Sequence, residues 1–435
     1  MSRDPIGWLY SLQRFGIKLG LDGIETLLDR LGHPESAFSS VLVGGTNGKG
    51  SVAAMLEAML AASGVRTGLY TSPHLIRPNE RIRIAGSDIP SGDLDRHLET
   101  VREACERAVA DDGLATHPYF FEVMTATALH AFQEAGVRVA VLEVGLGGRL
   151  DATNAVDAEL SIVVTVDLDH TERLGRRLEQ IAAEKAGIAK KDKPLVSGVA
   201  QEDARAVLAR ACRAAGSRFI EAAQVASLIE GDGGAFALRT ARAHYEGLRT
   251  ALPGRHQMEN ARVALVGFEE LSQTLRLKAE PGDVKRGLAS VRWAGRLQWI
   301  SGTPPLLLDG AHNPAGASVL AAYLRARGGR RPVLLFGSMQ DKDVPLMLSQ
   351  LAGLVEALIL TRATVERAAA PQELAEQVPQ GMGPAQVFPD PGQALERARV
   401  LAGPEGVVLV AGSLYLVGEI LGRLEGHDGP GQIPL

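Results

Sequence analysis

Short apolar runs alternate with amphipathic segments along most of the chain. The first clear pair is an apolar run at 41–43 followed by a segment whose apolar residues recur at i, i+3, i+4 and i+7, the spacing of one helix face. That face consists of Val52, Met55, Leu56, Met59 and Leu60. Two further apolar runs, at 137–144 and 160–166, are typical of buried strands. The pattern predicts an α/β protein with a mostly parallel sheet.

The alternation becomes more regular after residue 295. Strands are predicted near 305–308, 332–336, 356–361 and 406–411. Helices are predicted near 315–327, 344–353, 391–402 and 413–424. We therefore expect a P-loop parallel-sheet ATPase domain over residues 1–294 and a smaller Rossmann-like α/β domain over 295–435. No G-x-G-x-x-G pattern follows the strands of the second domain, so the sequence does not predict a dinucleotide site there.

A glycine-rich turn joins the run at 41–43 to its helix. It reads Gly44-Gly45-Thr46-Asn47-Gly48-Lys49-Gly50. Glycines let backbone N–H groups approach phosphate oxygens, and a helix N-terminus adds N–H donors that have no partner within the helix. Lys49 can reach the β- and γ-phosphates, and Ser51 can offer its hydroxyl to Mg²⁺. The strict G-x-x-x-x-G-K-[ST] pattern fails, because Val43 stands at its first glycine and Gly50 separates Lys49 from Ser51.

The composition narrows the possible partners. The 435 residues are 46% hydrophobic, and 46 basic against 51 acidic residues give a formal charge of −5. The lack of a basic excess argues against nucleic acid as the main partner. Cys105 and Cys212 form no disulfide or metal pattern, which is typical of a reducing compartment. Without a secretory leader or a stretch long enough to cross a membrane, we expect a soluble cytoplasmic protein.

Polar residues follow several of the predicted strands. Ser72 lies beyond a short strand-like run, Glu143 lies near the end of the run at 137–144, and His170 follows the run at 160–166. The carboxyl ends of parallel strands share one edge of a sheet, and we expect Glu143 and His170 at the ends of neighbouring strands, so these side chains are expected to meet there. A carboxylate and an imidazole can bind a divalent metal, although Mg²⁺ prefers oxygen ligands. The residue types alone therefore leave the metal open.

Six separated motifs resemble one family. They are G-T-N-G-K-G-S at 45–51, T-S-P-H-L at 71–75, E-V-G-L-G-G-R-L-D-A-T-N at 143–154, E-K-A-G-I at 184–188, H-Q-x-x-N-A at 256–261 and D-G-A-H-N-P at 309–314. Their types and order resemble those of folylpolyglutamate synthases and dihydrofolate synthases, within the Mur ligase superfamily. The resemblance covers both predicted domains and is weak at 91–117 and 200–250.

The resemblance implies ATP, one or two Mg²⁺ ions and a set of binding residues. The implied nucleotide contacts are Thr46, Asn47, Gly48, Lys49, Gly50 and Ser51 in the turn, Asn260 at the adenine, and Arg296, Asp309 and His312 from the second domain. The implied metal ligands are Ser51, Ser72, Glu143, His170 and Lys185, the last as a carbamate formed with CO₂. The implied contacts to the pterin-bearing substrate are Ser72, Phe121, Thr125, Arg149 and Asp151. Plain core packing would explain Phe121 equally well. Lys49, His170 and Lys185 are the implied catalytic residues.

These features predict an amide-forming ligase. The substrate carboxylate would attack the γ-phosphate of ATP, and the amino group of L-glutamate would then displace phosphate from the acyl phosphate. We expect a monomeric, bifunctional dihydrofolate synthase/folylpolyglutamate synthase that uses small-molecule substrates and binds neither nucleic acid nor membranes. A monofunctional folylpolyglutamate synthase stays open, because single-activity members share most of the motifs.

Three other classes fit the sequence less well. A cell-wall Mur ligase would carry a UDP-binding domain ahead of the glycine turn, where about forty residues stand here. A P-loop kinase or ATPase would need neither the second domain nor the E-K-A-G-I segment. A nucleotide-dependent binding protein without catalysis would not need the complete set of candidate metal ligands.

Overall fold

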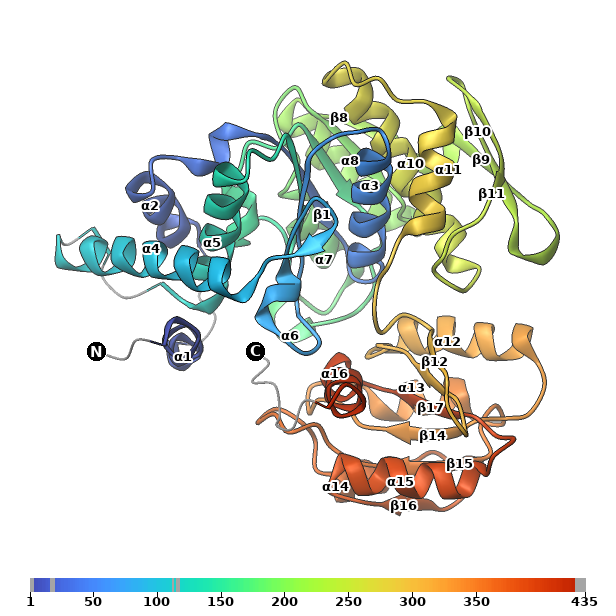
Figure 1. Cartoon of the computed structure of the whole chain (residues 1–435). Helices are drawn as coiled ribbons and strands as arrows, with labels where there is room; N and C mark the ends of the chain where they lie inside the picture. Colours follow the sequence, from blue (N-terminus) through green and yellow to red (C-terminus); the bar gives the residue numbers. More distant parts are fainter. Residues whose placement is uncertain (1–3, 16–19, 112, 115–117, 427–435) are drawn as a thin grey trace.

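A large, mostly parallel sheet forms the centre of the first part of the molecule. The structure is a computed structural model that describes residues 4–15, 20–111, 113–114 and 118–426, and Figure 1 shows its two parts. The eight-stranded sheet has the order β4-β3-β2-β5-β1-β6-β7-β8. Its strands are β1 (Ser39–Gly44), β2 (Thr67–Tyr70), β3 (Ile82–Ile84), β4 (Ser87–Asp88), β5 (Val139–Glu143), β6 (Leu160–Val163), β7 (Pro194–Ser197) and β8 (Arg218–Glu221). The β2–β3 and β3–β4 pairs are antiparallel, and the other neighbours are parallel.

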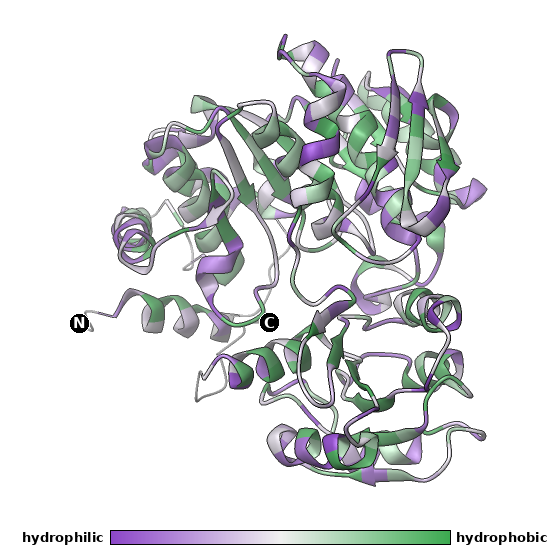
Figure 2. Ribbon diagram, turned by 45° about the vertical axis from the view of Figure 1, so that its right-hand side comes forward, coloured by the Kyte–Doolittle hydropathy of each residue, from purple (hydrophilic) through white to green (hydrophobic). Residues whose placement is uncertain are grey.

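Helices cover both faces of this sheet, so its central strands are apolar on both sides. On β1, Leu42 packs into one core cluster, while Val41 and Val43 pack into the other. The first cluster includes α1 (Pro5–Ser11), α2 (Asp22–Arg30), α4 (Ser91–Ala110), α5 (Phe120–Glu134), α7 (Leu178–Ala186) and α8 (Glu202–Ala215). The second includes α3 (Lys49–Ala62), α10 (His256–Thr274) and α11 (Pro281–Ser290). Figure 2 shows the hydrophobic strands at the centre of this arrangement.

Shorter elements complete the first part. An antiparallel sheet of order β11-β10-β9 packs beside α10 and α11. It consists of β9 (Ala226–Glu230), β10 (Phe236–Thr240) and β11 (His244–Leu248). The short helices are α6 (Thr171–Leu174) and α9 (Ala222–Val225), and the 3-10 turns are η1 (Leu12–Phe15), η2 (Pro34–Ala37), η3 (Pro78–Arg81), η4 (Ala152–Ala155) and η5 (Asp232–Gly234).

The second part contains a six-stranded sheet of order β12-β13-β17-β14-β15-β16. Its strands are β12 (Gln298–Ile300), β13 (Leu306–Leu308), β14 (Val333–Phe336), β15 (Ala357–Leu360), β16 (Ala385–Val387) and β17 (Val408–Ala411). Its helices are α12 (Pro314–Arg327), α13 (Val344–Leu351), α14 (Pro371–Glu376), α15 (Pro391–Ala402) and α16 (Leu414–Leu424). Only β12 is antiparallel to its neighbour. The predicted α/β class, with a mostly parallel sheet in the first part and a Rossmann-like second part, is confirmed.

The structure corrects several details of the sequence prediction. The run at 160–166 forms a strand only as far as Val163, because the following residues leave the ladder and support the glycine turn. The strands β12 and β16 and the helix α14 were not predicted, since each is short and lacks a strong apolar pattern.

The predicted domain boundary at 294/295 falls between α11 and β12. Across the described part of the chain, every helix is too short or too polar to traverse a lipid bilayer.

Candidate active site

The glycine turn lies at the carboxyl end of β1, in the middle of the large sheet, and leads directly into α3. Lys49 is the first residue of α3, and its Nζ donates to the carbonyl oxygens of Gly45 and Thr46 at 3.2 and 3.3 Å. Gly48 has φ +80°, and a Cβ at that position would lie 2.9 Å from Oδ1 of Asn260. Only glycine fits this left-handed position and this close approach. The turn has the form that phosphate groups require.

The segment after β6 supports the turn. The backbone N–H of Thr46 donates to the carbonyl of Thr165 at 2.9 Å, and that of Asn47 donates to Oγ1 of Thr165 at 2.9 Å. The N–H of Asp167 donates to Oγ1 of Thr46 at 3.0 Å. Residues 165–167 therefore hold the turn in its shape and explain why the β6 ladder ends at Val163.

Gln257 links the turn to α10, and sequence reasoning gave this residue no role. Its Nε2 donates to Oγ of Ser51 at 3.3 Å, and its Oε1 accepts from Nδ2 of Asn260 at 2.9 Å. Gln257 and Ser51 are both buried. Its position inside the H-Q-x-x-N-A motif was the sequence signal that could have identified Gln257. The contact shows how α10 positions both the Ser51 hydroxyl and the Asn260 side chain.

β1 and its glycine turn lie between β5, which ends at Glu143, and β6, which precedes His170 along the chain. Glu143 and His170 were predicted at the ends of neighbouring strands, and this is wrong, because β1 lies between β5 and β6. The error arose because strand order follows pairing rather than chain order. The turn of β1 therefore lies between the strand that ends at Glu143 and the strand that leads to His170.

The protonation of these groups suits a divalent metal. The Glu143 carboxylate is buried and accepts from the backbone N–H of Ser72 at 3.0 Å. Burial raises its pKa, and the charge of Lys49 opposes that shift. Burial and the charge of Lys342 lower the pKa of His170 to about 4, so its ring is neutral near pH 7. A neutral imidazole and a buried carboxylate that a cation would ionise fit a metal ion.

Lys185 is buried on α7 with 3% of its surface exposed. Burial first, and the charge of Lys49 second, lower its pKa to about 7. The loop after β5 packs directly against this helix: the N–H of Arg149 donates to the carbonyl of Glu184 at 2.9 Å. A Cβ at Gly148 would lie 2.7 Å from that same oxygen. The E-V-G-L-G-G-R-L-D and E-K-A-G-I motifs therefore form one packed unit.

The residues predicted on the substrate side gather around the same loop. The ring of Phe121 lies against Gly145, where a Cβ would approach it to 2.6 Å, and near Tyr70, with ring centroids 5.9 Å apart. Thr125 is fully buried and its Oγ1 lies 2.8 Å from the carbonyl of Phe121. These contacts place both residues at the base of α5, beside the loop.

Asp151 and Arg149 have partners within the chain. The Asp151 carboxylate accepts from the N–H groups of Leu146 and Thr153 at 2.9 and 3.0 Å, which fixes the loop. Arg149 pairs with Glu184 at 2.9 Å. Direct contacts from these two side chains to a substrate stay predictions. In the structure, the Asp151 carboxylate organises the loop through its hydrogen bonds.

The second part brings Arg296, Asp309 and His312 to the same edge. The Asp309 carboxylate accepts from the N–H groups of Leu297 and Ala311 at 2.9 and 3.0 Å. Arg296 lies against Gly310, and its charge reaches both Asp309 and Glu143. His312 is held by a 2.8 Å contact between its Nδ1 and the carbonyl of Gly310.

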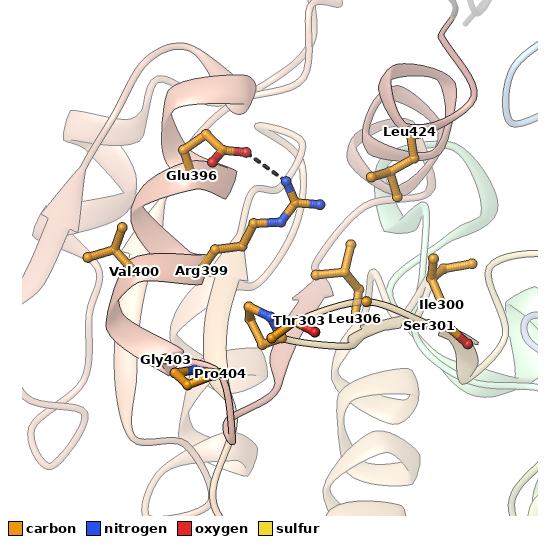
Figure 3. A pocket seen from close by; sticks show the side chains of 12 residues that line it. Ile300, Ser301, Thr303, Leu306, Glu396, Arg399, Val400, Gly403, Pro404 and Leu424 are labelled. Carbon is orange, nitrogen blue, oxygen red and sulfur yellow. Dashed lines mark hydrogen bonds and ion pairs between the residues drawn. The ribbon is translucent and has the colours of Figure 1, made fainter.

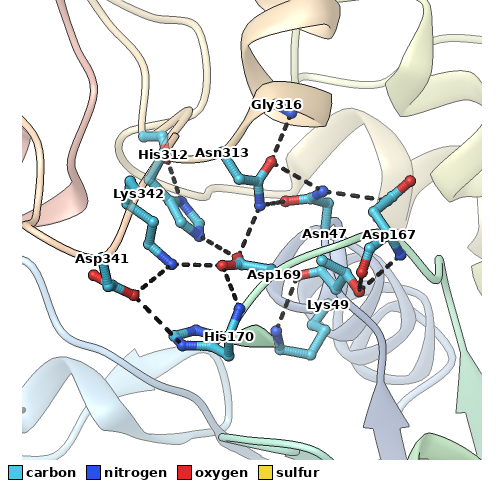
Figure 4. A network of polar contacts seen from close by, with 12 residues as sticks. Asn47, Lys49, Asp167, Asp169, His170, His312, Asn313, Gly316, Asp341 and Lys342 are labelled. Carbon is cyan, nitrogen blue, oxygen red and sulfur yellow. Dashed lines mark hydrogen bonds and ion pairs between the residues drawn. The ribbon is translucent and has the colours of Figure 1, made fainter. Parts of the chain in front are cut away.

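A polar network centred on Asp169 joins the two parts (Figure 4). Nδ2 of Asn313 donates to Oδ2 of Asp169 at 3.0 Å and lies 3.0 Å from Oδ1 of Asn47. Lys342 donates to Oδ1 of Asp169 at 2.5 Å, and Nε2 of His312 lies 3.6 Å from Oδ2. Burial alone would raise the pKa of Asp169, but His312, Lys342 and His170 outweigh burial and lower it.

Sequence reasoning missed this network. The D-G-A-H-N-P motif was assigned through Asp309 and His312, and Asn313, Asp169 and Lys342 were given no part in joining the two domains. Oδ1 of Asn313 accepts from the N–H of Gly316 at 2.8 Å and caps the start of α12. The same side chain therefore caps a helix and bridges the two parts, which no spacing within one segment could indicate.

A separate cavity of 560 Å³ lies in the second part (Figure 3). It is lined by the loop between β12 and β13 and by residues of α15 and α16, including the Arg399–Glu396 pair. None of the predicted nucleotide, metal or substrate residues lines it. The cavity does not belong to the candidate active site.

The fold and the site define a Mur-type ATP-dependent ligase. The family described as Mur ligase middle domain matches residues 43–267, and that described as Mur ligase, glutamate ligase domain matches residues 295–414. A Bacillus subtilis dihydrofolate synthase/folylpolyglutamate synthase is 32% identical over 429 residues, covering 97% of this chain and 99% of that protein. The chain belongs to the dihydrofolate synthase/folylpolyglutamate synthase family.

Solved structures agree with this assignment. Escherichia coli FolC in complex with DHPP and ADP has a TM-score of 0.88 at 31% identity and covers 98% of each chain. Mycobacterium tuberculosis folylpolyglutamate synthase complexed with ADP has a TM-score of 0.90 at 30% identity, covering 98% of this chain and 100% of that one. A Haloferax volcanii protein named "Probable bifunctional folylpolyglutamate synthase/dihydropteroate synthase" is 37% identical, but this chain spans only 50% of its length.

Proposed function

We propose that the protein joins L-glutamate to the carboxylate of a pterin-bearing acid, accepting both dihydropteroate and reduced folates. The observation that carries the proposal is that the charge of Lys49 reaches both the buried Glu143 carboxylate and the buried Lys185 amine, whose pKa is lowered to about 7. His170 follows Asp169, whose charge also reaches Lys185. A lysine in that state can form a carbamate, which the ligation site needs and a simple P-loop kinase does not.

The chain's own residues perform the first step by binding and orienting. Lys49 and the N–H groups of the turn hold the phosphates, and Arg296 and His312 approach them from the second part. The substrate carboxylate oxygen forms a bond to the γ-phosphorus as the bond to ADP breaks. When bound, Mg²⁺ would supply positive charge to the phosphates, held by Ser51, Ser72, Glu143, His170 and carbamylated Lys185.

The second step forms the amide. The amino nitrogen of L-glutamate attacks the acyl carbon, phosphate leaves, and the nitrogen loses a proton. Water competes with this attack, because it hydrolyses an acyl phosphate. The contacts of Asn313, His312 and Lys342 with Asp169 hold the second part against the site and exclude water.

Named relatives support a double activity. The Bacillus subtilis and Escherichia coli relatives are both named dihydrofolate synthase/folylpolyglutamate synthase, at 32% identity each. A Lacticaseibacillus casei relative named folylpolyglutamate synthase is also 32% identical, so identity alone does not separate the two cases. The segment G-I-K-L-G-L-D-G, which resembles the version in enzymes that accept dihydropteroate, lies partly outside the described residues, at 16–19.

Two further expectations accompany this function. The monomeric state stays a prediction. The cytoplasmic location rests on the composition and stays a prediction.

The deciding experiment measures phosphate release with ATP, Mg²⁺ and L-glutamate, adding dihydropteroate or tetrahydrofolate separately. We expect turnover with each acceptor and none without L-glutamate. Turnover with tetrahydrofolate alone would reduce the function to a folylpolyglutamate synthase, and glutamate-independent turnover would favour an ATPase. Lys49→Ala is the negative control, and Lys285→Ala, at an exposed position of α11, is the matched lysine control.

A further inference from the structure

Two buried histidines face each other between α4 and α5, away from the candidate active site. His97 and His130 are 3% and 9% exposed, and their Nδ1 atoms lie 2.9 Å apart. Glu134 follows His130 by one helical turn, and its Oε1 lies 3.6 Å from Nε2 of His130. Within the described ranges, this is the one group of three His, Cys, Asp or Glu residues whose possible ligand atoms all lie within 4.8 Å of one another.

We propose that His97, His130 and Glu134 form a binding site for a Zn²⁺ ion that joins α4 to α5. Zn–N bonds of about 2.0–2.1 Å at a tetrahedral angle place two imidazole nitrogens about 3.3 Å apart. The two Nδ1 atoms therefore need to separate by only a few tenths of an ångström. An oxygen of the Glu134 carboxylate lies within 4.8 Å of a ring nitrogen of each histidine. It turns from Nε2 of His130 towards the two Nδ1 atoms to complete a two-histidine, one-carboxylate set, and water takes the fourth position.

Hydrogen bonds fix which ring nitrogen of His97 carries the proton. Nη2 of Arg96 lies 3.1 Å from Nε2 of His97, which makes that nitrogen the acceptor and leaves the proton of His97 on Nδ1. When the metal binds Nδ1, this proton moves to Nε2, and the ring stays neutral.

Arg96 competes with the metal. Its Nη1 donates to Oε2 of Glu134 at 2.5 Å, and its Nη2 contacts His97. Its side chain is half-exposed, with 51% of its surface accessible, so it can turn into solvent. Metal binding thus exchanges a guanidinium for a divalent cation at Glu134. Removal of Arg96 takes away a like charge and frees the carboxylate, which strengthens metal binding.

The chemistry separates this site from the magnesium site. Imidazole nitrogen suits Zn²⁺, whereas Mg²⁺ prefers an octahedral shell of oxygens. The site lies towards the end of α5 opposite to Phe121 and Thr125. A metal there fastens the helix that carries these two residues to its neighbour α4 (Figure 1) and does not touch the reacting groups.

The test measures Zn²⁺ bound to the whole chain in a large excess of Mg²⁺, by metal analysis after dialysis, with Co²⁺ absorption as a second readout. We expect one Zn²⁺ per chain and the intense visible bands of tetrahedral Co²⁺. Glu134→Gln, at an exposed position that folding tolerates, should weaken binding at least about tenfold. His97→Ala should abolish it, and Arg96→Ala should strengthen it.

His244→Ala removes a histidine of β11 that pairs with Glu246 at 3.3 Å, and it should change nothing. Absence of bound Zn²⁺ in the unaltered chain would overturn the proposal. Binding that survives His97→Ala undiminished would also overturn it, because the ion would then lie elsewhere.

Discussion

Nζ of Lys342, in the second part of the molecule, lies 2.5 Å from Oδ1 of Asp169, in the first. Their side chains are only 7% and 8% exposed, and Asp169 also accepts from Asn313. The residue that follows Asp169 is His170, a candidate metal ligand. Closure of the second part therefore acts on the segment that positions that ligand.

Lys342→Ala should open the two parts. The variant removes the ammonium partner of the buried Asp169 carboxylate, which keeps the side chains of Asn313 and His312 as partners. We expect a cost of about 3 kcal/mol, which corresponds to a loss of about 100-fold in kcat/KM if closure is required for ligation. Steady-state kinetics for ATP would measure this. The control is Lys193→Ala, which removes a more exposed pair with Glu159 and should cost under about 1 kcal/mol with activity unchanged. Activity within twofold of the unaltered enzyme would contradict the importance of the contact.

Local motifs predicted the parts of the site but not their assembly. The glycine turn, Glu143 and Lys185 each lie in a segment whose spacing or family resemblance identified them. Asp169, Lys342 and Asn313 meet only because the second part folds back onto the first, over sequence separations of 173 and 144 residues. Gln257 was missed for the same reason, since its partner Ser51 lies 206 residues away. Strand order was also beyond the sequence, because pairing depends on contacts between distant segments.

Lys185 should show carbamate chemistry with a defined pH dependence. Its pKa of about 7 lies below the ordinary 10.5, so the folded chain holds the amine neutral in a range where an unfolded chain binds a proton. The free energy of unfolding therefore rises with pH between about 7 and 10.5, and below 7, where both states bind the proton, it no longer depends on this group's titration. Because only the neutral amine adds CO₂, bicarbonate-stimulated activity should fall as the pH drops below about 7.

The substitution Lys185→Ala tests the same assignment directly. We expect little activity in this variant and partial recovery with a short-chain carboxylic acid, which would supply the missing carboxylate. The neighbouring residue Glu184, which is partly buried and pairs with Arg149, gives the control: Glu184→Gln should need no rescue. Full activity of Lys185→Ala without any added acid would contradict the assignment.

Gly148→Ala should misplace Lys185 without touching the nucleotide turn. The added Cβ would stand 2.7 Å from the Glu184 carbonyl and 3.1 Å from Cα of Lys185, both backbone atoms that cannot move aside cheaply. We expect kcat to fall at least about tenfold, with destabilisation of about 1–3 kcal/mol from overpacking. Thermal melting and kinetics would separate the two effects. Gly92→Ala, where a Cβ meets nothing within 4 Å, is the matched control and should leave both unchanged.

Gly50 explains why the glycine turn departs from the strict P-loop pattern. A Cβ at this position would lie 2.6 Å from Cζ2 of Trp293, in the segment that leads into the second part. The guanidinium of Arg83 covers the same ring, 5.2 Å from its centroid, so the indole has little room to shift. The extra glycine between Lys49 and Ser51 lets the linking segment rest directly on the first turn of α3.

Gly50→Ala should therefore raise the KM for ATP, because the displaced indole disturbs both the phosphate turn and the chain segment that leads from Trp293 to Arg296. If the clash is the cause, Trp293→Ala should remove it, and the double variant should bind ATP more tightly than Gly50→Ala alone. A double variant no better than Gly50→Ala would show that the glycine is needed for another reason.

The chain has three tryptophans, so replacing Trp8 and Trp299 by Phe leaves Trp293 as the sole reporter. Its fluorescence should change when ATP is added to that background, and an unchanged spectrum at saturating ATP would place the nucleotide away from this turn.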